Sequence, residues 1–274
     1  MGALTEYPAV SRPEKDDIFI IDGVKGTRKI PMSDTAIELA GMISPINHRN
    51  IWRGKCLGNA VTAAQKAAIA TSTFDDIFIG DYWTISGIDW VVSDMDYFYQ
   101  TGDTNITKHH LVIVPRLGWY THVMNDAHVT TGGYANSKMR ASGLNEAKAK
   151  FTAAFGDMII THRELFTNAV TNGKPSGGAW MDATVELMNE IMVYGTTVFT
   201  PACDGTTVPY LYTTNKVQLA AFRLNPAFIT VRGQWYFLRD VVSSAYFASV
   251  SAIGDAHAYG AAHAGYVRPY AIIG

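Results

Sequence analysis

Two acidic residues come closest to a catalytic pattern in this sequence. Asp94 and Asp96 are two positions apart, so an extended backbone would place both carboxyl groups on one face. Paired carboxylates could bind a cation or serve as acid and base in hydrolysis. Asp103 is the next acidic residue after this pair, and we expect a turn or a salt bridge here in preference to catalysis.

The histidines do not form a metal-binding pattern. His109 and His110 are adjacent, and neighbouring strand residues point to opposite faces, so the two cannot chelate one ion side by side. We expect one of them to be buried and hydrogen-bonded and the other to be exposed. His122 and His128 lie in a region with Gly and Asn, which predicts a loop.

Cysteines and catalytic motifs add no enzymatic signal. Cys56 and Cys203 are far apart and neither belongs to a CxxC motif. Two reduced thiols are expected, with a single bridge as the alternative. The sequence contains no GxSxG, HExxH, GxGxxG or Walker loop. These observations predict a protein that is not an enzyme and needs no metal or cofactor.

The composition excludes several classes of protein. Of 274 residues, 48% are apolar, 12% are aromatic and 17% are charged, which is unlike a disordered chain. The net charge of −2 gives no footprint for nucleic acid. The longest apolar runs, such as 111–114, are far shorter than a membrane span, and the first residues lack the pattern of a secretory signal. We therefore expect a soluble globular protein without membrane insertion.

The chain is expected to have two parts. Residues 1–45 are rich in Pro and too short to bury a core, which predicts an N-terminal attachment or oligomerisation segment. A strand is expected at 18–21, a turn at Asp22-Gly23, and a helix over 34–40 capped by Ser33.

Residues 46–274 are expected to form the ligand-binding domain. An Ala-rich run predicts a helix within 59–71, and apolar spacing predicts two main helices over 145–158 and 182–194. Short β-rich runs predict strands at 77–79, 82–85, 90–92, 111–114, 206–208, 227–231 and 235–238. Strands without regular βαβ alternation favour the α+β class with antiparallel sheets.

The last 34 residues, 241–274, are unusual. They hold nine Ala, four Ser, four Gly and four Tyr, and the two charged residues are Asp255 and Arg268. Single Tyr and His residues on a background of small residues are typical of adaptable binding surfaces with rigid aromatic anchors. A buried sheet is the other interpretation of this composition.

Several motifs together resemble a known family. The segments Trp235–Val241, Phe247-Ala248, Gly254 and Gly265–Pro269 are similar to the C-terminal signature of C-type-lectin-fold variable proteins, the targets of diversity-generating retroelements. Residues 80–85, 94–99, 109–115 and 132–134 resemble tail-associated proteins of phages and prophages of gut bacteria, and residues 21–30 resemble their attachment region.

The resemblance implies a C-type-lectin-like domain that presents a hypervariable face, about 241–266, on a fixed scaffold. The matching scaffold positions are Trp235, Leu238, Arg239, Asp240, Phe247, Arg268 and Pro269. The interleaved positions, implied to vary and to contact the ligand, are Ser244, Tyr246, Ser249, Ser251, Asp255, His257, Tyr259, His263 and Tyr266. Tyr266 stands where the family has Gly, so it is either variable or a scaffold replacement.

The resemblance also implies a function. Adenine-directed mutation never yields Lys, Glu, Gln, Met or Trp from the starting codons, and none of the 38 such residues in the chain falls within 241–274. The implied protein is a receptor-binding adhesin of a phage tail, present in the virion and assembled in the cytoplasm of the bacterial host. Its implied partners are a bacterial surface protein or glycan, other tail proteins, and two further copies in a homotrimer.

Two other functions stay open at this point. One is a structural virion protein, a head decoration or tail adaptor with the same fold and no ligand. The other is an enzyme, either a hydrolase that uses Asp94 and Asp96 or a relative of formylglycine-generating oxidases. The Glu-Pro-Asn and Trp-Asn-Asp triplets of calcium-dependent lectins are absent from the sequence, so a calcium-bridged sugar site is not expected.

Overall fold

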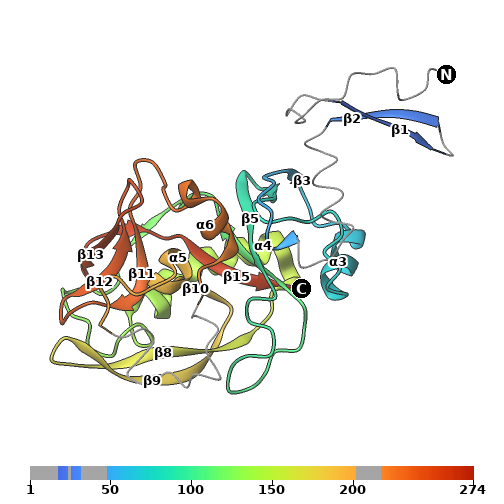
Figure 1. Ribbon diagram of the computed structural model, residues 1–274. Coiled ribbons are helices and arrows are strands. Elements are labelled where there is room, and N and C mark those ends of the chain that lie inside the picture. The colour runs from blue at the N-terminus through green and yellow to red at the C-terminus, as the bar shows by residue number, and fades with distance from the viewer. Residues whose placement is uncertain (1–17, 24–25, 32–47, 202–216) are drawn as a thin grey trace. The chain divides into compact units, whose positions relative to one another are not determined.

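The computed structural model describes residues 18–23, 26–31, 48–201 and 217–274 (Figure 1). The chain divides after His48 into two compact units. In the first unit, β1 (Ile18–Gly23) and β2 (Gly26–Pro31) form an antiparallel hairpin. The strand predicted at 18–21 is therefore confirmed. The helix predicted over 34–40 and the strand predicted at 206–208 lie outside the described residues.

The larger sheet of the second unit has six strands in the order β10-β15-β6-β5-β4-β3. The strand β15 lies between β10 and β6, so the last strand in sequence occupies an interior position. Neighbouring strands are antiparallel except β3 and β4, which are parallel. The six strands are β3 (Cys56–Gly58), β4 (Tyr82–Ile85), β5 (Ile88–Met95), β6 (Leu111–Pro115), β10 (Val185–Leu187) and β15 (Pro269–Ile273).

A second sheet of five strands, in the order β13-β12-β11-β14-β7, contains most of the C-terminal segment (Figure 1). Its strands are β7 (Thr121–His122), β11 (Tyr236–Val241), β12 (Tyr246–Val250), β13 (Ala256–Gly260) and β14 (Gly265–Tyr266). The strands β8 (His162–Thr171) and β9 (Lys174–Ala183) form a separate long hairpin.

Helices are few and short in the described part of the chain. They are α3 (Ala63–Ala70), α4 (Asn145–Phe155), α5 (Glu190–Tyr194) and α6 (Ala220–Leu224), with a π-helical turn at Met139–Gly143 and 3-10 turns at Gly156–Met158 and Pro226–Phe228. At the start of α3, Thr62 and Gln65 form a reciprocal capping box. This mixture of antiparallel sheets and short helices confirms the α+β class.

The helix α4 joins the six-stranded sheet through aromatic side chains. Its residues Phe151 and Phe155 are buried, as their spacing predicts. The ring of Phe151 lies 4.5 Å from Trp90 of β5, edge to face, and Phe155 lies 5.5 Å from the same indole. The helix expected over 145–158 is thus confirmed as α4 and the 3-10 turn that follows it.

The prediction of a second main helix over 182–194 is wrong. The strand β9 extends to Ala183, and Val185–Leu187 form β10, which pairs with β15 in the register Val185↔Ala271. Only Glu190–Tyr194 are helical, behind a side-chain cap from Asn189. The apolar residues at helical spacing are buried, but pairing with β15 outweighs the helical preference of the segment.

Two expected strands are also absent among the described residues. In place of a strand at 227–231 there is the 3-10 turn Pro226–Phe228, which Pro226 favours at its first position. Residues 77–79 are buried but irregular, because Phe74, Asp76 and Gly80 all have positive φ values. Ile79 makes a single β-bridge, to Trp52. The strands predicted at 82–85, 90–92, 111–114 and 235–238 are present as β4, β5, β6 and β11.

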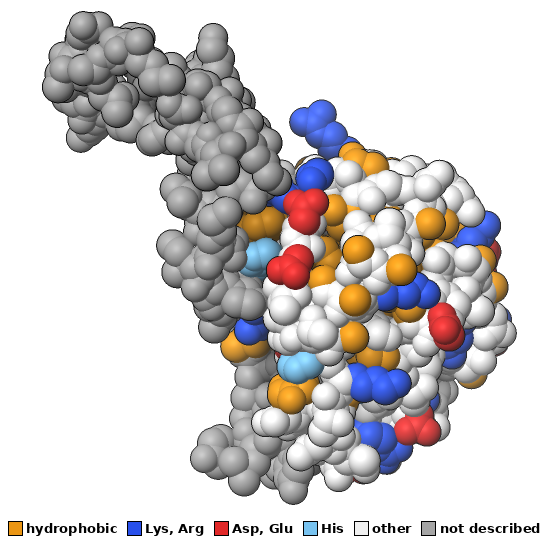
Figure 2. All heavy atoms as spheres, turned by 90° about the vertical axis from the view of Figure 1, so that its right-hand side faces the viewer, with side chains coloured by type: hydrophobic (Ala, Val, Ile, Leu, Met, Phe, Trp, Pro, Cys, Tyr) orange, Lys and Arg blue, Asp and Glu red, His pale blue; other side chains and the backbone are white. Residues whose placement is uncertain are grey.

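The surface agrees with the mixed charge composition. On the face shown in Figure 2, Lys and Arg side chains are interspersed with Asp, Glu and apolar side chains.

None of the helices in the described ranges combines the length and the apolar character that a membrane crossing requires.

Candidate binding surface

The residues with predicted catalytic chemistry serve the fold. Asp94 is buried, accepts from Arg49 Nε at 2.5 Å, and also accepts from the backbone N–H of Ala220 at 3.0 Å. Burial raises the pKa of Asp94, although the charge of Arg49 acts against this. The carboxylate of Asp96 instead bonds to Nδ1 of His109 at 2.8 Å. The salt bridge expected for this acidic pair is therefore present.

The adjacent histidines take the expected arrangement in part, since one is buried and hydrogen-bonded but the other is half-buried. His110 is buried and its Nε2 accepts from the backbone N–H of Phe98 at 3.0 Å. Burial lowers its pKa to about 4, so the imidazole is neutral near pH 7. His109 retains 28% side-chain exposure and stacks on Tyr99 at 4.6 Å. Each histidine is thus fixed by local contacts of its own.

No group of three or more His, Cys, Asp or Glu side chains in the described ranges could hold a metal ion. Cys56 is exposed and has a free thiol, while Cys203 lies outside the described residues.

Three of the positions implied to contact ligand meet in one aromatic cluster. Tyr259 of β13 is stacked on Trp235 with the ring centroids 4.2 Å apart, and the tilted ring of His257 lies 4.7 Å from it. His263 approaches the Tyr259 ring edge-on at 5.9 Å. We call this set, together with His128, the Tyr259 cluster; it contains aromatic anchors and histidine donors and acceptors.

His128 is the member that sequence reasoning missed. Its ring lies 4.8 Å from that of His263, and its Nδ1 accepts from the backbone N–H of Ala262 at 3.3 Å. The sequence placed it in a loop, and no local signal pairs that loop with residues more than a hundred positions later. Gly260 makes the approach possible, because a Cβ there would lie 2.3 Å from His128 Nδ1.

A glycine also makes room for the central stack. A Cβ at Gly265 would lie 2.5 Å from the Trp235 ring and 3.0 Å from Phe237. Gly265 thus allows the indole to lie flat beside β14 and against Tyr259. Trp235 is half-buried, so this residue, assigned to the scaffold, also contributes to the surface of the Tyr259 cluster.

Ser244 and Tyr246 lie at the same end of the sheet as His263. Tyr246 begins β12 opposite Gly260, and its side chain is 47% exposed. The carbonyl of Ser244 accepts from the backbone N–H of Thr130 at 3.0 Å, which holds the His128 loop alongside. The tip of the β8–β9 hairpin reaches the same place, since a Cβ at Gly173 would lie 2.9 Å from Ser244 N.

Ser251 and Asp255 lie at the opposite end, in the turn between β12 and β13. The hydroxyl of Ser251 accepts from the backbone N–H groups of Ile253 at 3.3 Å and Asp255 at 3.1 Å, so it shapes the turn. The length of β12 separates this turn from Tyr246 by roughly 14 Å. One small ligand could not contact both ends.

Of the implied contact positions, Ser249 requires correction, and the packing of Tyr266 favours the scaffold alternative. Ser249 is only 1% exposed because β12 places it opposite His257 on one side and Phe237 on the other, so it cannot touch a ligand in this conformation. Tyr266 is half-buried in β14 and packs against the main core, while its backbone N–H donates to Trp235 O at 3.0 Å. Its packing is that of a scaffold residue.

Beneath the surface, the implied scaffold residues are buried. Arg268 donates to the carbonyls of Pro115, Ile229 and Phe228 and to the Tyr236 hydroxyl. Asp240 accepts from the backbone N–H of Glu190 at 2.5 Å. Leu238 and Phe247 lie in the two apolar cores, and Pro269 pairs with Leu187.

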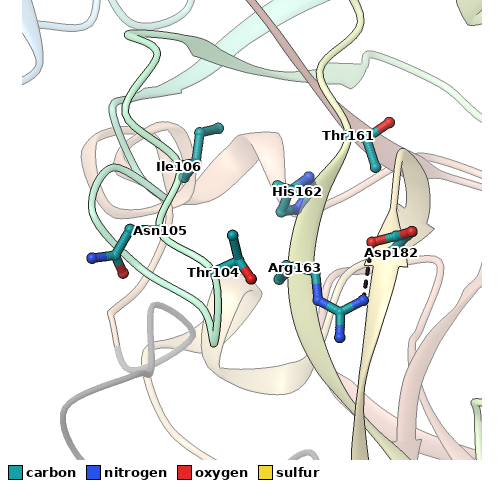
Figure 3. Close-up of a pocket in the computed structure, with 7 residues that line it drawn as sticks. All are labelled: Thr104, Asn105, Ile106, Thr161, His162, Arg163 and Asp182. Carbon is teal, nitrogen blue, oxygen red and sulfur yellow. Dashed lines mark hydrogen bonds and ion pairs between the residues drawn. The ribbon is translucent and has the colours of Figure 1, made fainter.

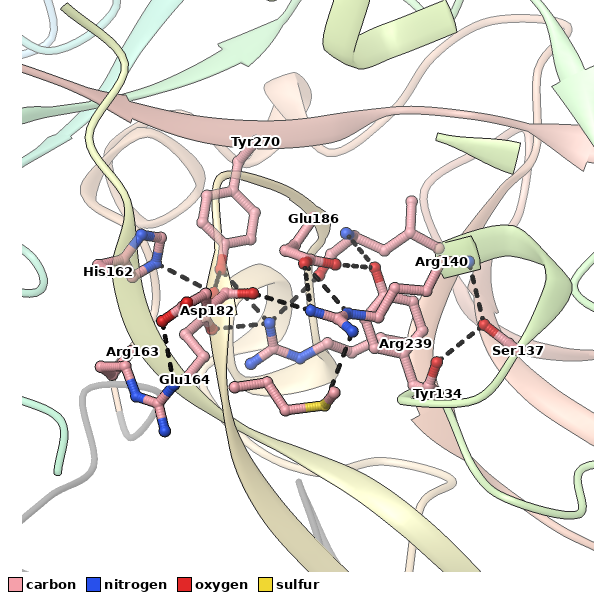
Figure 4. Close-up of polar contacts among 12 residues, drawn as sticks. Tyr134, Ser137, Arg140, His162, Arg163, Glu164, Asp182, Glu186, Arg239 and Tyr270 are labelled. Carbon is pink, nitrogen blue, oxygen red and sulfur yellow. Dashed lines mark hydrogen bonds and ion pairs between the residues drawn. The ribbon is translucent and has the colours of Figure 1, made fainter. Parts of the chain in front are cut away.

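Arg239 belongs to a buried polar network that ties the C-terminal sheet to β8 and β10 (Figure 4). It donates to Glu164 Oε2 at 2.8 Å, and the Tyr270 hydroxyl donates to the same carboxylate. Next to it, Glu186 accepts from the Tyr134 hydroxyl at 2.6 Å and from Arg140 Nε at 3.1 Å. Burial raises the pKa of Glu186, against the opposing charge of Arg140.

The described surface therefore has two levels: exposed Tyr, His and Ser side chains above a layer of buried and internally bonded Arg, Asp, Leu and Phe.

Comparison of the whole chain with protein-family models, with curated proteins and with solved structures yields no match.

Proposed function

We propose that this protein is a receptor-binding protein of a phage or prophage tail, whose second unit is a C-type-lectin-like domain. It binds a bacterial surface protein or glycan through the Tyr259 cluster and the neighbouring residues Ser244 and Tyr246. The first unit attaches it to other tail proteins, and the assembly is a homotrimer in the virion.

The observation that supports the proposal is that the implied scaffold residues are mostly buried, whereas most of the implied contact residues are exposed or half-buried. Leu238, Arg239, Asp240, Phe247, Arg268 and Pro269, the scaffold positions apart from Trp235, are all buried. Of the interleaved positions, Ser244, Tyr246, Asp255, His257 and His263 are exposed. A surface whose exposed residues can change while the buried layer stays constant suits a binding site under diversification.

Binding would rely on rigid aromatic anchors and on many weak contacts. The stack of Trp235, Tyr259 and His257 fixes three rings before the ligand arrives, which lowers the entropy cost of binding. An aromatic anchor buried at the centre of an interface contributes about 2 kcal/mol or more. Several copies on one virion would convert a modest single-site affinity into firm adsorption.

Labelled protein applied to intact cells of a panel of gut bacteria tests the proposal. We expect selective labelling of some strains and loss of labelling in Tyr246→Ala combined with His257→Ala. Ile253→Ala serves as the control, because it removes an exposed apolar side chain at the far turn of the same hairpin. Equal labelling by the double variant and the control would overturn the assigned surface.

Sequencing of the gene's surroundings separates this function from that of a structural virion protein. The proposal requires a near-duplicate of the region encoding 241–266 beside a reverse transcriptase gene, with mismatches only at adenines. Variation spread evenly over the chain among close relatives, with no such duplicate, would favour a decoration protein or tail adaptor.

A further inference from the structure

The strand β13 is the outermost strand of the five-stranded sheet (Figure 1). It pairs with β12 on one side, and none of the described strands pairs with its other side. The backbone N–H and C=O groups along such an edge are a template for a further strand. The hydrogen bonds of β13 show which of these groups are available.

The register of β13 on β12 decides which residues bond inward. At one end the N–H of Ala261 donates to the carbonyl of Ala245 at 2.9 Å, and at the other the N–H of Ser251 donates to the carbonyl of Asp255 at 2.8 Å. The register between them has no shift, and bonded pairs alternate with non-bonded pairs in an antiparallel ladder. The odd-numbered residues of β13 therefore bond to β12, while the even-numbered residues direct their backbone groups to the open edge.

Some of the groups at that edge already have partners and others do not. The carbonyl of Ala258 accepts from Nδ1 of His257 at 3.0 Å, and the carbonyl of Gly260 accepts from the N–H of His263 at 3.0 Å. The N–H and the C=O of Ala256 and the N–H of Ala258 have no hydrogen-bond partner in the described structure. A strand laid along β13 would bond to these groups.

Other outer strands of the second unit are protected against such addition. The β8–β9 hairpin carries charged residues, among them Arg163 and Lys174, and its register shifts twice. The edge strands β3, β7 and β10 have only two or three residues each. In contrast, β13 reads Ala-His-Ala-Tyr-Gly, with no charge, no proline and no register shift. It lacks the features by which proteins keep an edge from pairing with another chain.

The side chains implied to contact ligand alternate with these open backbone groups. Asp255, His257 and Tyr259 are the implied contact positions, whereas the open groups belong to Ala256 and Ala258. Backbone bonds do not depend on the side chain, so changes at 257 and 259 would leave the attachment of an added strand intact. The side chains there would lie beside those of the partner, about 4.5–5.5 Å away between Cβ atoms, and would select among partners.

An added strand also has the shape that the surface requires. The five residues of β13 span roughly 14 Å, from the turn with Ser251 and Asp255 to the end where Tyr246 and His263 lie. One small ligand cannot contact both ends of this distance. An extended segment of about five residues can, because it rises by the same amount per residue as β13 itself.

We infer that the partner of this surface is a protein, and that an extended segment of it adds to β13 as a sixth strand of the sheet. The backbone of Ala256 and Ala258 attaches the segment, and the side chains at 255, 257 and 259 give the specificity. This inference rests on the proposed function and narrows the receptor from a protein or a glycan to a polypeptide.

Cells of a strain that the full-length protein labels test the class of partner. We expect proteinase K treatment of the cells to abolish labelling and periodate, which cleaves sugar diols, to leave it unchanged. Labelling that survives proteinase K and is lost after periodate would identify a glycan, which overturns this inference and leaves the proposed function standing. Labelling of no strain would overturn the proposed function and this inference with it.

Variants of Ala258 test the edge. Ala258→Pro removes the outward N–H and leaves the bonds to β12 in place, and proline is tolerated at such a position of an edge strand. It should lower labelling at least about fivefold, the loss expected for one hydrogen bond. Ala258→Ser, which keeps the N–H, should label normally. So should Asn105→Ala, because Asn105 lies outside this sheet and lines a cavity with Thr104 and Arg163 (Figure 3). Equal labelling by the Pro and Ser variants would overturn the inference.

Hydrogen exchange of the unmodified protein tests the edge without any variant. The amide protons of Ala256 and Ala258 should exchange at least about tenfold faster than those of His257 and Tyr259, which bond to β12. The measurement is a two-dimensional NMR spectrum of the ¹⁵N-labelled full-length protein after transfer to D₂O. Equally slow exchange of all four amides would show that the edge is closed, as it would be if a second copy paired with it, and would overturn the inference.

Discussion

The guanidinium of Arg239 lies 2.8 Å from the carboxylate of Glu164, and neither side chain is more than 1% exposed. Arg239 belongs to β11 of the C-terminal sheet and Glu164 to β8, so this ion pair joins the proposed binding surface to the long hairpin. The Arg239 guanidinium also lies over the Phe166 ring at 4.9 Å. The pair is therefore both a charge contact and a packing contact.

Replacement of Arg239 by Met should destabilise the protein severely. The substitution leaves the Glu164 carboxylate buried without its cation, and breaking such a pair costs about 3–5 kcal/mol. Urea unfolding followed by circular dichroism measures the loss. In Arg239→Met combined with Glu164→Leu, where no charge is left unpaired, much of the stability should return; a double variant as unstable as the single one contradicts this explanation.

Glu164 should also make the stability depend on acid pH. Burial by itself would raise its pKa, but the Arg239 charge and the bonds from His162 and Tyr270 lower it from 4.5 to about 2. As the pH falls below about 5, the unfolded chain binds a proton before the folded one does, so the free energy of unfolding decreases towards pH 2.

The variant Glu164→Gln isolates that contribution. It cannot titrate, so its free energy of unfolding should fall less than that of the wild type between pH 5.5 and pH 3.5. Asp94 and Glu186, whose pKa values are raised by burial, contribute the opposite trend and do so in both proteins. Urea midpoints at three pH values make the comparison. Parallel pH profiles of the two proteins would show that Glu164 does not cause the loss of stability at acid pH.

Phe151→Ala should destabilise the second unit by about 3–5 kcal/mol, the usual cost of removing a buried aromatic ring. The ring is fully buried and lies edge to face with Trp90 at 4.5 Å. Thr152→Ala is the matched control, because its side chain is on the exposed face of the same helix. A urea midpoint for Phe151→Ala close to that of the control would show that α4 is not anchored as described.

Gly265→Ala should disorder the aromatic stack while the cores remain intact. The new methyl group would fall 2.5 Å from the Trp235 ring, so the indole must leave its place against Tyr259. We expect a changed near-ultraviolet circular dichroism spectrum, an unchanged far-ultraviolet spectrum, and loss of cell labelling. Gly87→Ala adds a methyl group that would meet nothing within 4 Å, at a backbone position with positive φ, so it adds strain without a clash and should leave the near-ultraviolet spectrum unchanged.

The sequence was informative where a pattern is local and misleading where pairing is distant. The apolar face of 145–158 and the buried run 111–114 fold as their patterns predict, because each segment buries one continuous stripe. Residues 185–187 became a strand because β15, more than eighty positions later, pairs with them. No local pattern in 182–194 reports that partner.

The β8–β9 hairpin had a local signal that was not used. Asn172 and Gly173 have φ values of 50° and 72°, which is the type I′ turn that Asn-Gly favours between two strands. The candidate site was predictable in part: the spacing of small and aromatic residues identified Tyr259 and His257. The burial of Ser249 and the approach of His128 depend on sheet register and on a distant loop.

The interior position of β15 has a consequence for synthesis of the chain. The six-stranded sheet cannot close until Pro269–Ile273, which follow residues 241–266, have left the ribosome. A chain cut short by a stop codon anywhere in 241–266 would lack a central strand of the main sheet as well as part of its surface. Translation through 241–266 to the end of β15 is thus a condition of folding, so truncated chains should fail to fold.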